Sequence, residues 1–458
     1  MSKSKVAIGI APSTLLQSDA VILSESVMKR WNIPATQSVT LQFGSWYEQI
    51  RIIPAAKQKG IMLNTTLAKT LAFHRTNTPT YIHLKYIAET KTLQLGPIIG
   101  ILVSKDFPDD LSRPFGAISR FCLEVSEAAH AQGAYVFFFT PKHMRIDTHS
   151  VFGWTYHDHW QQKQMPIPHV IYNRLSSRKI ESSPTVQQFW KFVTNKYNTT
   201  IFNEQFLDKT EVFQALEQHG TVRTYLPESK PLASMNTLKQ MSNKYSTLFV
   251  KPVEGSMGRG IIRITADTTN GYQVQRTTNQ GTRHGQYTNL TQLYTRLFRK
   301  KTTKYQVQQG LRLIEVQKRP VDFRVLAQKN HLGEWSITST VARIAGSQHF
   351  VSNIARGGTL SRVEEAISKS NILTPNNGLE LITRLKHAAM QIAKAIDKQL
   401  EAHFAELGID FAVDRFGRIW LLEVNSKPSK NDNTPLKDGK IRPSVKKMIA
   451  YAKYISEF

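Results

Sequence analysis

The sequence predicts a multidomain α/β protein with a β-rich N-terminal domain, an open α/β domain and a larger C-terminal α/β domain. The chain has 458 residues, more than one hydrophobic core usually organises, so two to four domains are expected. Short alternating runs fill residues 1–95, whereas strand and helix patterns alternate from residue 96 onward. The hydrophobic content of 40% is that of an ordinary globular protein.

Residues 1–95 predict a small barrel. The runs at 38–43 and 48–53 alternate between apolar and polar residues, as half-buried strands do. Residues 23–34 and 63–73 resemble each other, because in each a short strand leads through Ser or Asn into a short helix. We therefore expect a barrel-like domain built from two weakly repeated halves.

Residues 96–200 predict an open α/β domain. The apolar runs GPIIGILV (96–103) and AYVFFF (134–139) are typical of buried strands. Between them, residues 115–133 predict a helix that ends at Gly133. A further strand begins in HVIYNRLSSRK (169–179), which ends in basic residues.

Composition limits the partners and the compartment. Sixty Lys and Arg against 34 Asp and Glu give a formal charge of +26, which attracts polyanions. The basic residues are not interleaved with stacking aromatic residues or set in a DNA-binding motif, so we do not expect nucleic-acid binding. Cys122 is the single cysteine, and no apolar stretch approaches the roughly 20 residues of a membrane span. We therefore expect a cytoplasmic protein without a membrane span.

A predicted hairpin at residues 408–425 (GIDFAVDRFGRIWLLEVN) carries the first chemical signal. Pairing of its two strands would bring Asp410 near Glu423, and Asn425 would share the face of Glu423. Two carboxylates and an amide are hard oxygen ligands suited to Mg²⁺ that also holds phosphate oxygens. The alternative is an ordinary hairpin with solvated acids.

A glycine-rich loop at residues 247–264 carries the second signal. Lys251 ends a strand, and Gly255, Gly258 and Gly260 leave the following loop free of Cβ atoms, so its backbone amides can approach phosphate oxygens. The loop is not a P-loop, since no Gly-Lys-Ser/Thr opens a helix after it. A simple hairpin would also explain it. Downstream, residues 379–404 show a helical apolar stripe that faces a core.

Together and in order, these motifs resemble the ATP-grasp superfamily. The resemblance implies a C-terminal ATP-grasp fold over residues 201–458, with a nucleotide lid at about 212–305, preceded by a pre-ATP-grasp domain at 96–200 and the barrel-like domain at 1–95. It also implies a Mg²⁺ site, in which Mn²⁺ could replace Mg²⁺, at Asp410, Glu423 and Asn425. ATP would contact Lys209, Lys251, Glu254, Gly255, Ser256, Gly258, Gly260, Gln308, Gln309, Gly310, Leu311 and Asp322. The implied catalytic residues are Arg324, Arg343, Asn353 and Arg356.

Each of these assignments has an alternative in ordinary structure. Lys209 could be an exposed helix residue, and Asp322 and Arg324 could form a structural ion pair. Arg343, Asn353 and Arg356 could belong to a solvated loop. The chain also departs from the D-alanine ligase branch, because Gly408 stands where that branch carries an arginine. Arg324 or Arg343 would then have to supply the contact to an acyl phosphate.

Over its whole length the chain resembles the YheC/YheD-type family of spore-forming bacteria, described as endospore coat-associated. The resemblance implies an ATP- and Mg²⁺-dependent ligase that joins a carboxylate to an amine, or to a thiol, through an acyl phosphate. The charge favours an acidic peptide or polymer as the carboxylate substrate, and the family favours spore coat proteins as partners and association with the coat. A non-catalytic coat protein that retains an ATP-binding fold, and a polyanion-binding protein, are the alternatives.

Overall fold

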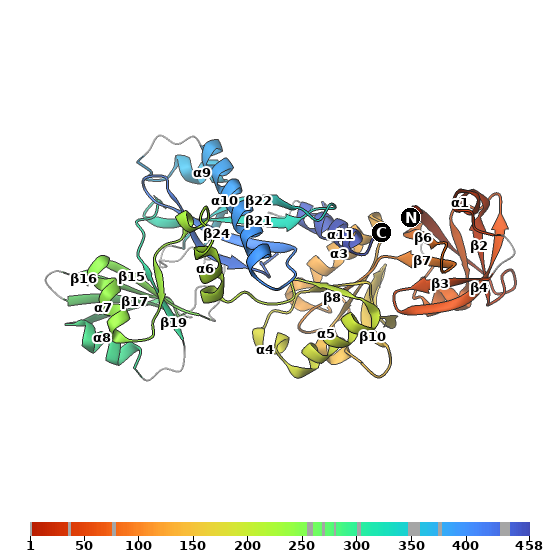
Figure 1. Ribbon diagram of the computed structural model, residues 1–458, viewed down its shortest axis with the longest axis horizontal. Coiled ribbons are helices and arrows are strands. Elements are labelled where there is room, and N and C mark those ends of the chain that lie inside the picture. The colour runs from red at the N-terminus through yellow and green to blue at the C-terminus, as the bar shows by residue number, and fades with distance from the viewer. Residues whose placement is uncertain are drawn as a thin grey trace.

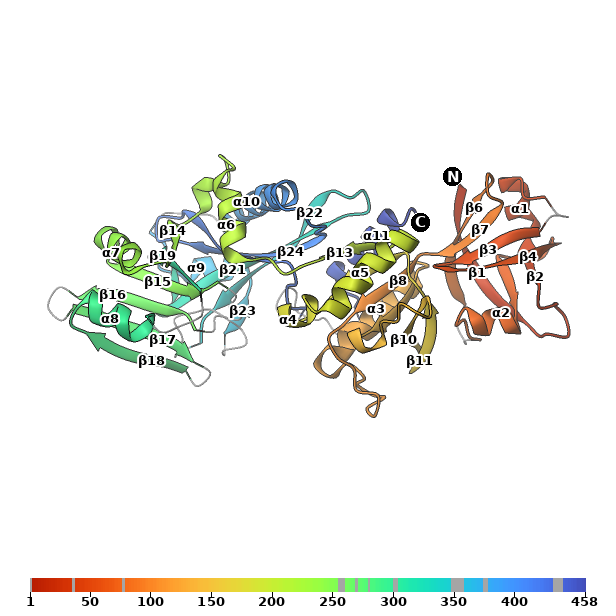
Figure 2. The ribbon, with the colours of Figure 1, turned by 60° about the horizontal axis from the view of Figure 1, so that its bottom comes forward.

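The computed structural model describes residues 2–34, 38–75, 79–253, 260–267, 271–278, 281–299, 304–346, 358–373, 378–430 and 440–458. It contains a closed barrel and three further sheets. Figures 1 and 2 show the barrel at one end of an elongated molecule and the sheet of the predicted lid at the other end. Among the described residues, no helix is long and apolar enough to cross a membrane.

The N-terminal barrel confirms the predicted β-rich unit. Its strand order is β1 (Ser2–Ala11), β5 (Ile61–Asn64), β2 (Ala20–Ser24), β4 (Trp46–Ala55), β3 (Ser38–Phe43), β7 (Thr92–Gly96) and β6 (Thr80–Ile87). Strand β2 leads directly into α1 (Glu25–Trp31), and β5 leads directly into α2 (Thr65–Thr70). These are the two similar strand–helix entries that the sequence predicts.

The next sheet confirms the strand and helix alternation after residue 96. Its order is β11 (His159–Pro166), β10 (Ser150–His157), β9 (Tyr135–Phe139), β8 (Ile98–Leu102), β12 (Val170–Asn173) and β13 (Thr200–Phe202). Every residue of β8 and β9 is buried, as the apolar runs predict. The helices are α3 (Ser119–Ala131), α4 (Arg178–Glu181) and α5 (Pro184–Tyr197). Gly133 follows α3 with a φ of 68°, which suits the predicted helix stop.

The sheet at the far end carries the predicted glycine-loop hairpin. Its order is β14 (Ser229–Pro231), β19 (Tyr305–Gln309), β15 (Thr247–Pro252), β16 (Ile262–Asp267), β17 (Gly271–Thr278) and β18 (Gly281–Tyr287). Helices α7 (Met235–Lys244) and α8 (Leu290–Leu297) share a core with it.

The last sheet carries the predicted metal hairpin. It runs β23 (Thr359–Ser361), β22 (Trp335–Ile344), β21 (Arg319–Lys329), β24 (Glu406–Val413) and β25 (Ile419–Asn425), and β20 (Glu315–Val316) pairs with β21. Helices α6 (Lys209–Glu217), α9 (Val363–Ser368) and α10 (Gly378–Gln399) share its core. The stripe of α10 is buried as predicted, but the helix ends at Gln399, five positions before the predicted end at residue 404.

The C-terminal helix α11 (Pro443–Ile455) packs on α3 beside the second sheet and also contacts β21 of the last sheet. Its residues Val445, Met448 and Ile449 belong to the same core as Phe121 and Val125 of α3. The domain boundaries proposed from the sequence do not include this return, because a helical stripe does not reveal which sheet it covers.

Candidate active site on the sheet that carries the hairpin

The polar residues of the C-terminal sheet lie on one face. Asp410 of β24 stands opposite Arg324 of β21 on one side and opposite Glu423 of β25 on the other. Asp322 of β21 stands opposite Arg343 of β22. Directly opposite residues project to the same face of a sheet, so these five side chains share a surface. Two of the predicted metal ligands and two of the predicted catalytic arginines are thereby brought together.

A β-bulge gives Glu423 this position. Asp410 pairs with Glu423, but Phe411 pairs with Leu421, which leaves Leu422 as an extra residue in β25. Strict alternation would place Glu423 on the same face as Leu421, which belongs to the apolar core. The bulge turns Glu423 to the polar face, and Asn425, which stands opposite Gly408, follows it.

Asp410 is held by both arginines. Arg324 donates to it through Nε and, at 3.0 Å, through Nη2, and Nη2 of Arg343 lies 3.1 Å from its second oxygen. Burial alone would raise the pKa of Asp410, but the charges of Arg324 and Arg343 outweigh burial and hold that pKa below its usual value. The carboxyl group is therefore an anion at neutral pH.

Asp322 completes this cluster by accepting a hydrogen bond from Nε of Arg343. Asp322, Arg324, Arg343 and Asp410 each expose only 6% of their surface. The alternative of a solvated loop is therefore wrong for Arg343. Arg324 forms an ion pair with Asp410, and Asp322 forms one with Arg343.

Gly408 leaves the space that Arg324 uses. A Cβ atom on Gly408 would lie 3.3 Å from Nη1 of Arg324 and 2.7 Å from Cβ of Pro428. The residue that lacks a side chain is thus covered by a guanidinium from the neighbouring strand. This contact gives a structural reason for a glycine at position 408, where the D-alanine ligase branch carries an arginine.

Two lysines approach Glu423 from other elements. Lys209 is the first residue of α6, and its Nζ lies 3.6 Å from Glu423. Lys251 of β15 comes from the sheet that carries the glycine-loop hairpin, and it donates to Oε1 of Gln308 at 2.5 Å. Burial and, to a lesser extent, the charge of Lys209 lower the pKa of Lys251, the charge of Glu423 opposes them, and the net pKa is about 8. Both lysines therefore lie within electrostatic reach of the polar face.

The resemblance assigns the backbone of residues 308–311 to adenine, and the side chain of Gln308 contacts Lys251. Nε2 of Gln308 donates to Ser229 at 2.8 Å while Oε1 accepts from Lys251. The backbone amides of Gln309 and Gly310 donate to the carbonyls of Glu228 and Thr247. An adenine contact in this stretch would therefore use its carbonyl groups or Leu311. The alternation in YQVQQ, which puts Gln306 and Gln308 on one strand face, was the available signal for the role of Gln308.

Of the glycine-loop residues and the residues after β22 that were predicted to form the site, Gly260 lies within the described part of the chain. Gly260 has a φ of 69°, a backbone conformation that favours glycine. Glu254, Gly255, Ser256 and Gly258 of the glycine loop, and Asn353 and Arg356 after β22, lie outside the described residues.

The chain is similar to a known protein family and to two proteins of Bacillus subtilis. The family described as YheC/D like ATP-grasp matches residues 198–455. The chain is 29% identical over 374 residues to endospore coat-associated protein YheD of Bacillus subtilis, which covers 80% of each protein. It is 24% identical over 324 residues to endospore coat-associated protein YheC of the same organism, covering 68% of this chain and 85% of YheC.

Among solved structures, D-alanyl-alanine synthetase A of Vibrio cholerae is 13% identical with a TM-score of 0.44, covering 79% of this chain and 99% of that protein. The family match spans β21, β22, β24 and β25, which supply the polar face, as well as α6 and β15, which supply the two lysines. Because it extends over more than half of the sequence, the chain belongs to the YheC/D-like ATP-grasp family.

Proposed function

We propose that the protein is an ATP-dependent ligase that activates a substrate carboxylate as an acyl phosphate and transfers it to an amine. The observation that carries the proposal is that Lys209 and Lys251 lie near Glu423, which stands opposite the buried carboxylate Asp410. Arg324 and Arg343 in turn hold Asp410. The family membership supports the nucleotide as ATP.

The two lysines would neutralise the phosphates of ATP. They reach the site from different elements, α6 and β15, and Gln308 orients Lys251. Phosphoryl transfer needs positioning and neutralised charge rather than a covalent nucleophile, so fixed cations suit it. We further propose that the glycine loop at residues 254–260 covers the triphosphate.

The donor set fits a hard divalent cation. Glu423 and Asn425 present carboxylate and amide oxygens on the polar face, and the Asp410 carboxylate lies beside them. We assign Mg²⁺, with Mn²⁺ as a substitute, to Glu423 and Asn425, with Asp410 as the third ligand. Bound there, the ion would neutralise charge on the β- and γ-phosphates. Since two guanidiniums already engage Asp410, Glu423 is the ligand of this set that we expect to matter most.

The arginines would act on the transferred phosphoryl group. A carboxylate oxygen of the substrate attacks the γ-phosphorus, the bond to the bridging oxygen breaks, and ADP leaves. The amine nitrogen then attacks the acyl carbon, loses its proton, and inorganic phosphate leaves. Arg324 and Arg343 carry the fixed positive charge that the oxygens of the phosphoryl group and the acyl phosphate require. Asn353 and Arg356 are proposed to assist.

The substrate class is a further proposal. The excess of 60 basic over 34 acidic residues supports an acidic peptide or polymer as the carboxylate substrate. A thiol acceptor would use the same activation chemistry. The names of YheD and YheC support a link to the spore coat, with coat proteins as partners of a cytoplasmic enzyme.

The test is substrate-dependent ADP release from Mg²⁺-ATP, screened with pools of amino acids and acidic peptides. We expect release that falls at least about a hundredfold in Glu423→Ala and in Lys251→Ala. Glu401→Ala and Lys398→Ala, at exposed positions of the same lobe, are the matched controls. Release that survives Glu423→Ala would refute the metal assignment. A chain that binds no ATP in calorimetry would leave the non-catalytic coat protein as the better reading.

A further inference from the structure

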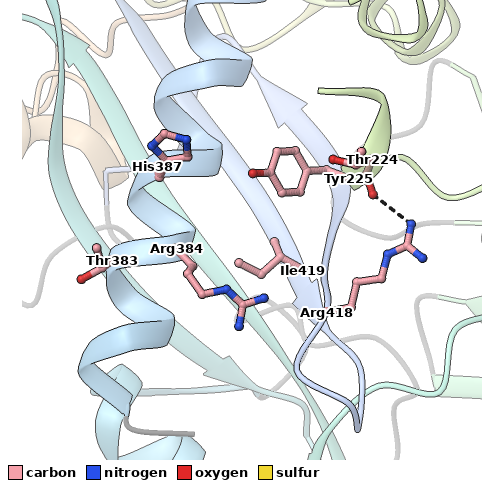
Figure 3. Close-up of a pocket in the computed structure, with 7 residues that line it drawn as sticks. All are labelled: Thr224, Tyr225, Thr383, Arg384, His387, Arg418 and Ile419. Atoms are coloured by element: carbon pink, nitrogen blue, oxygen red, sulfur yellow. Dashed lines mark hydrogen bonds between the residues drawn. The ribbon is translucent and has the colours of Figure 1, made fainter. Parts of the chain in front are cut away.

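A cavity of about 630 Å³ lies away from the polar face and has no role in the proposed reaction. Figure 3 shows its lining, which comes from three segments: the short turn at Arg223–Tyr225, one side of α10, and the start of β25. The ring of Tyr225 and the side chain of Ile419 form an apolar wall. Arg384, His387 and Arg418 supply the polar groups.

The cavity is on the reverse side of the catalytic sheet. Ile419 stands opposite Val413, and both belong to the apolar core under α10. Asp410 and Glu423 project from the other face of the same two strands. A molecule in this cavity would therefore contact different residues from a nucleotide at the polar face. Its binding would not depend on the proposed ligase activity.

The charge of the lining is positive and is not balanced within it. Nη2 of Arg418 donates to the carbonyl of Thr224 at 3.0 Å, and Nη2 of Arg384 donates to the carbonyl of Gly417 at 2.9 Å. No described residue that lines the cavity is acidic. Each guanidinium has five N–H donors, so donors remain for a ligand on both sides of Ile419.

The apolar wall is held in place. The hydroxyl of Tyr225 donates to Gln391 of α10 at 3.1 Å, which fixes the ring against the cavity. Arg418 also lies 3.8 Å from the centre of the Trp420 ring, a cation–π contact that orients its side chain. Two oriented cations beside a fixed aromatic ring can recognise an anionic group joined to a planar or apolar group.

We propose that this cavity binds a small molecule that carries a phosphate or carboxylate group on an aromatic or other apolar body. Arg384 and Arg418 bind the anionic group, and Tyr225 and Ile419 contact the apolar body. His387, on the next turn of α10 from Arg384, adds a further hydrogen-bonding group.

The experiment is calorimetric titration of the full chain, without ATP, with phenyl phosphate, benzoate and inorganic phosphate. We expect phenyl phosphate, benzoate or both to bind. If the anionic group of the ligand is a phosphate, phenyl phosphate should bind more tightly than inorganic phosphate. The double variant Arg384→Ala/Arg418→Ala is expected to weaken that binding at least about tenfold. Preference for phenyl phosphate or for benzoate identifies the anionic group.

Two controls locate the signal. Lys386→Ala removes an exposed cation of the same helix outside the lining and is expected to leave binding unchanged. Lys251→Ala alters the polar face and is also expected to leave it unchanged, so the result holds whether or not the chain is a ligase. The proposal is overturned if neither aryl anion binds, if the double variant binds as the wild type does, or if Lys251→Ala abolishes binding.

Discussion

Arg324 occupies the space above Gly408, and this contact makes a small residue at 408 a requirement of the site. In Gly408→Ala the new Cβ would meet Pro428 at 2.7 Å and Nη1 of Arg324 at 3.3 Å. We expect a loss of about 1–3 kcal/mol of stability from overpacking. We also expect ADP release to fall at least about tenfold while ADP binding persists, because the displaced guanidinium of Arg324 is proposed to stabilise the transferred phosphoryl group rather than to bind the nucleotide.

Urea unfolding and nucleotide calorimetry check these two expectations. Gly220→Ala is the matched control, since a Cβ atom there would meet nothing within 4 Å. An alanine at 408 that leaves both stability and ADP release unchanged would contradict the packing of Arg324 described here.

Lys251 predicts a pH dependence of nucleotide binding. Its pKa of about 8, lowered chiefly by burial, means that the amine carries its charge below pH 8 and loses it above. We expect affinity for ADP to fall between pH 7 and pH 9, and Lys251→Arg to remove this fall because a guanidinium stays charged. Calorimetry at pH 7, 8 and 9 measures both. An equal fall in the arginine variant would assign the titration to another group.

The same lowered pKa of Lys251 makes the stability of the fold rise with pH, whereas the affinity for ADP is expected to fall. Between pH 8 and the ordinary lysine pKa of 10.5, the unfolded chain binds more protons at Lys251 than the folded chain does. The contribution of Lys251 to stability therefore rises with pH across that window, so loss of ADP binding at pH 9 cannot be attributed to this lysine destabilising the fold.

At the scale of elements, the periodicity of the sequence predicted where strands and helices lie. It did not predict the local irregularities that decide which face of a sheet a side chain occupies. The strands β8 and β9 were predicted correctly because strands buried on both faces are continuously apolar, and α10 because burial of one face produces a helical apolar stripe. The bulge at Leu422 was not predicted, since an extra residue in a strand has no periodic signature. The pairing of Asp410 with Glu423 was anticipated, but the two arginines that hold Asp410 come from strands far away in sequence.

The C-terminal helix supplies a prediction about elements. Glu124 of α3 accepts from the backbone amide of Arg442 and pairs with its guanidinium, and both residues are buried. Glu124→Ala would leave a buried charge without this partner, so we expect a loss of about 3–5 kcal/mol. Urea unfolding measures it, and the exposed Glu127→Ala on the same helix should change stability by less than about 0.5 kcal/mol.

A double variant separates the ion pair from the packing of α11. Because a buried pair can be replaced by apolar residues at little cost, Glu124→Leu combined with Arg442→Met should recover most of the loss. Failure to recover would mean that the hydrogen bond to the backbone amide of Arg442, rather than the charge, fixes the start of α11.

At the scale of the whole molecule, the net charge of +26 predicts how an acidic substrate would be captured. Attraction between a basic surface and a polyanion acts over a distance set by salt, about 10 Å at 0.1 M ionic strength. Activity on an acidic peptide should therefore fall steeply as salt rises, mainly through KM, since the buried arginine cluster at the site is shielded from the solution.

The comparison that isolates this effect is a neutral peptide of equal length that carries the same reactive carboxylate. We expect its KM to change little between 0.05 and 0.3 M salt, whereas that of the acidic peptide rises at least about tenfold. Equal salt dependence of the two would show that the charge does not select the substrate. A fall in kcat with both peptides would instead point to Lys209 and Lys251. Salt would weaken their proposed contacts with the phosphates of ATP, whichever peptide is used. The distinction matters because the hairpin and lysines are proposed to serve the nucleotide chemistry, while the basic surface is proposed to select the carboxylate substrate.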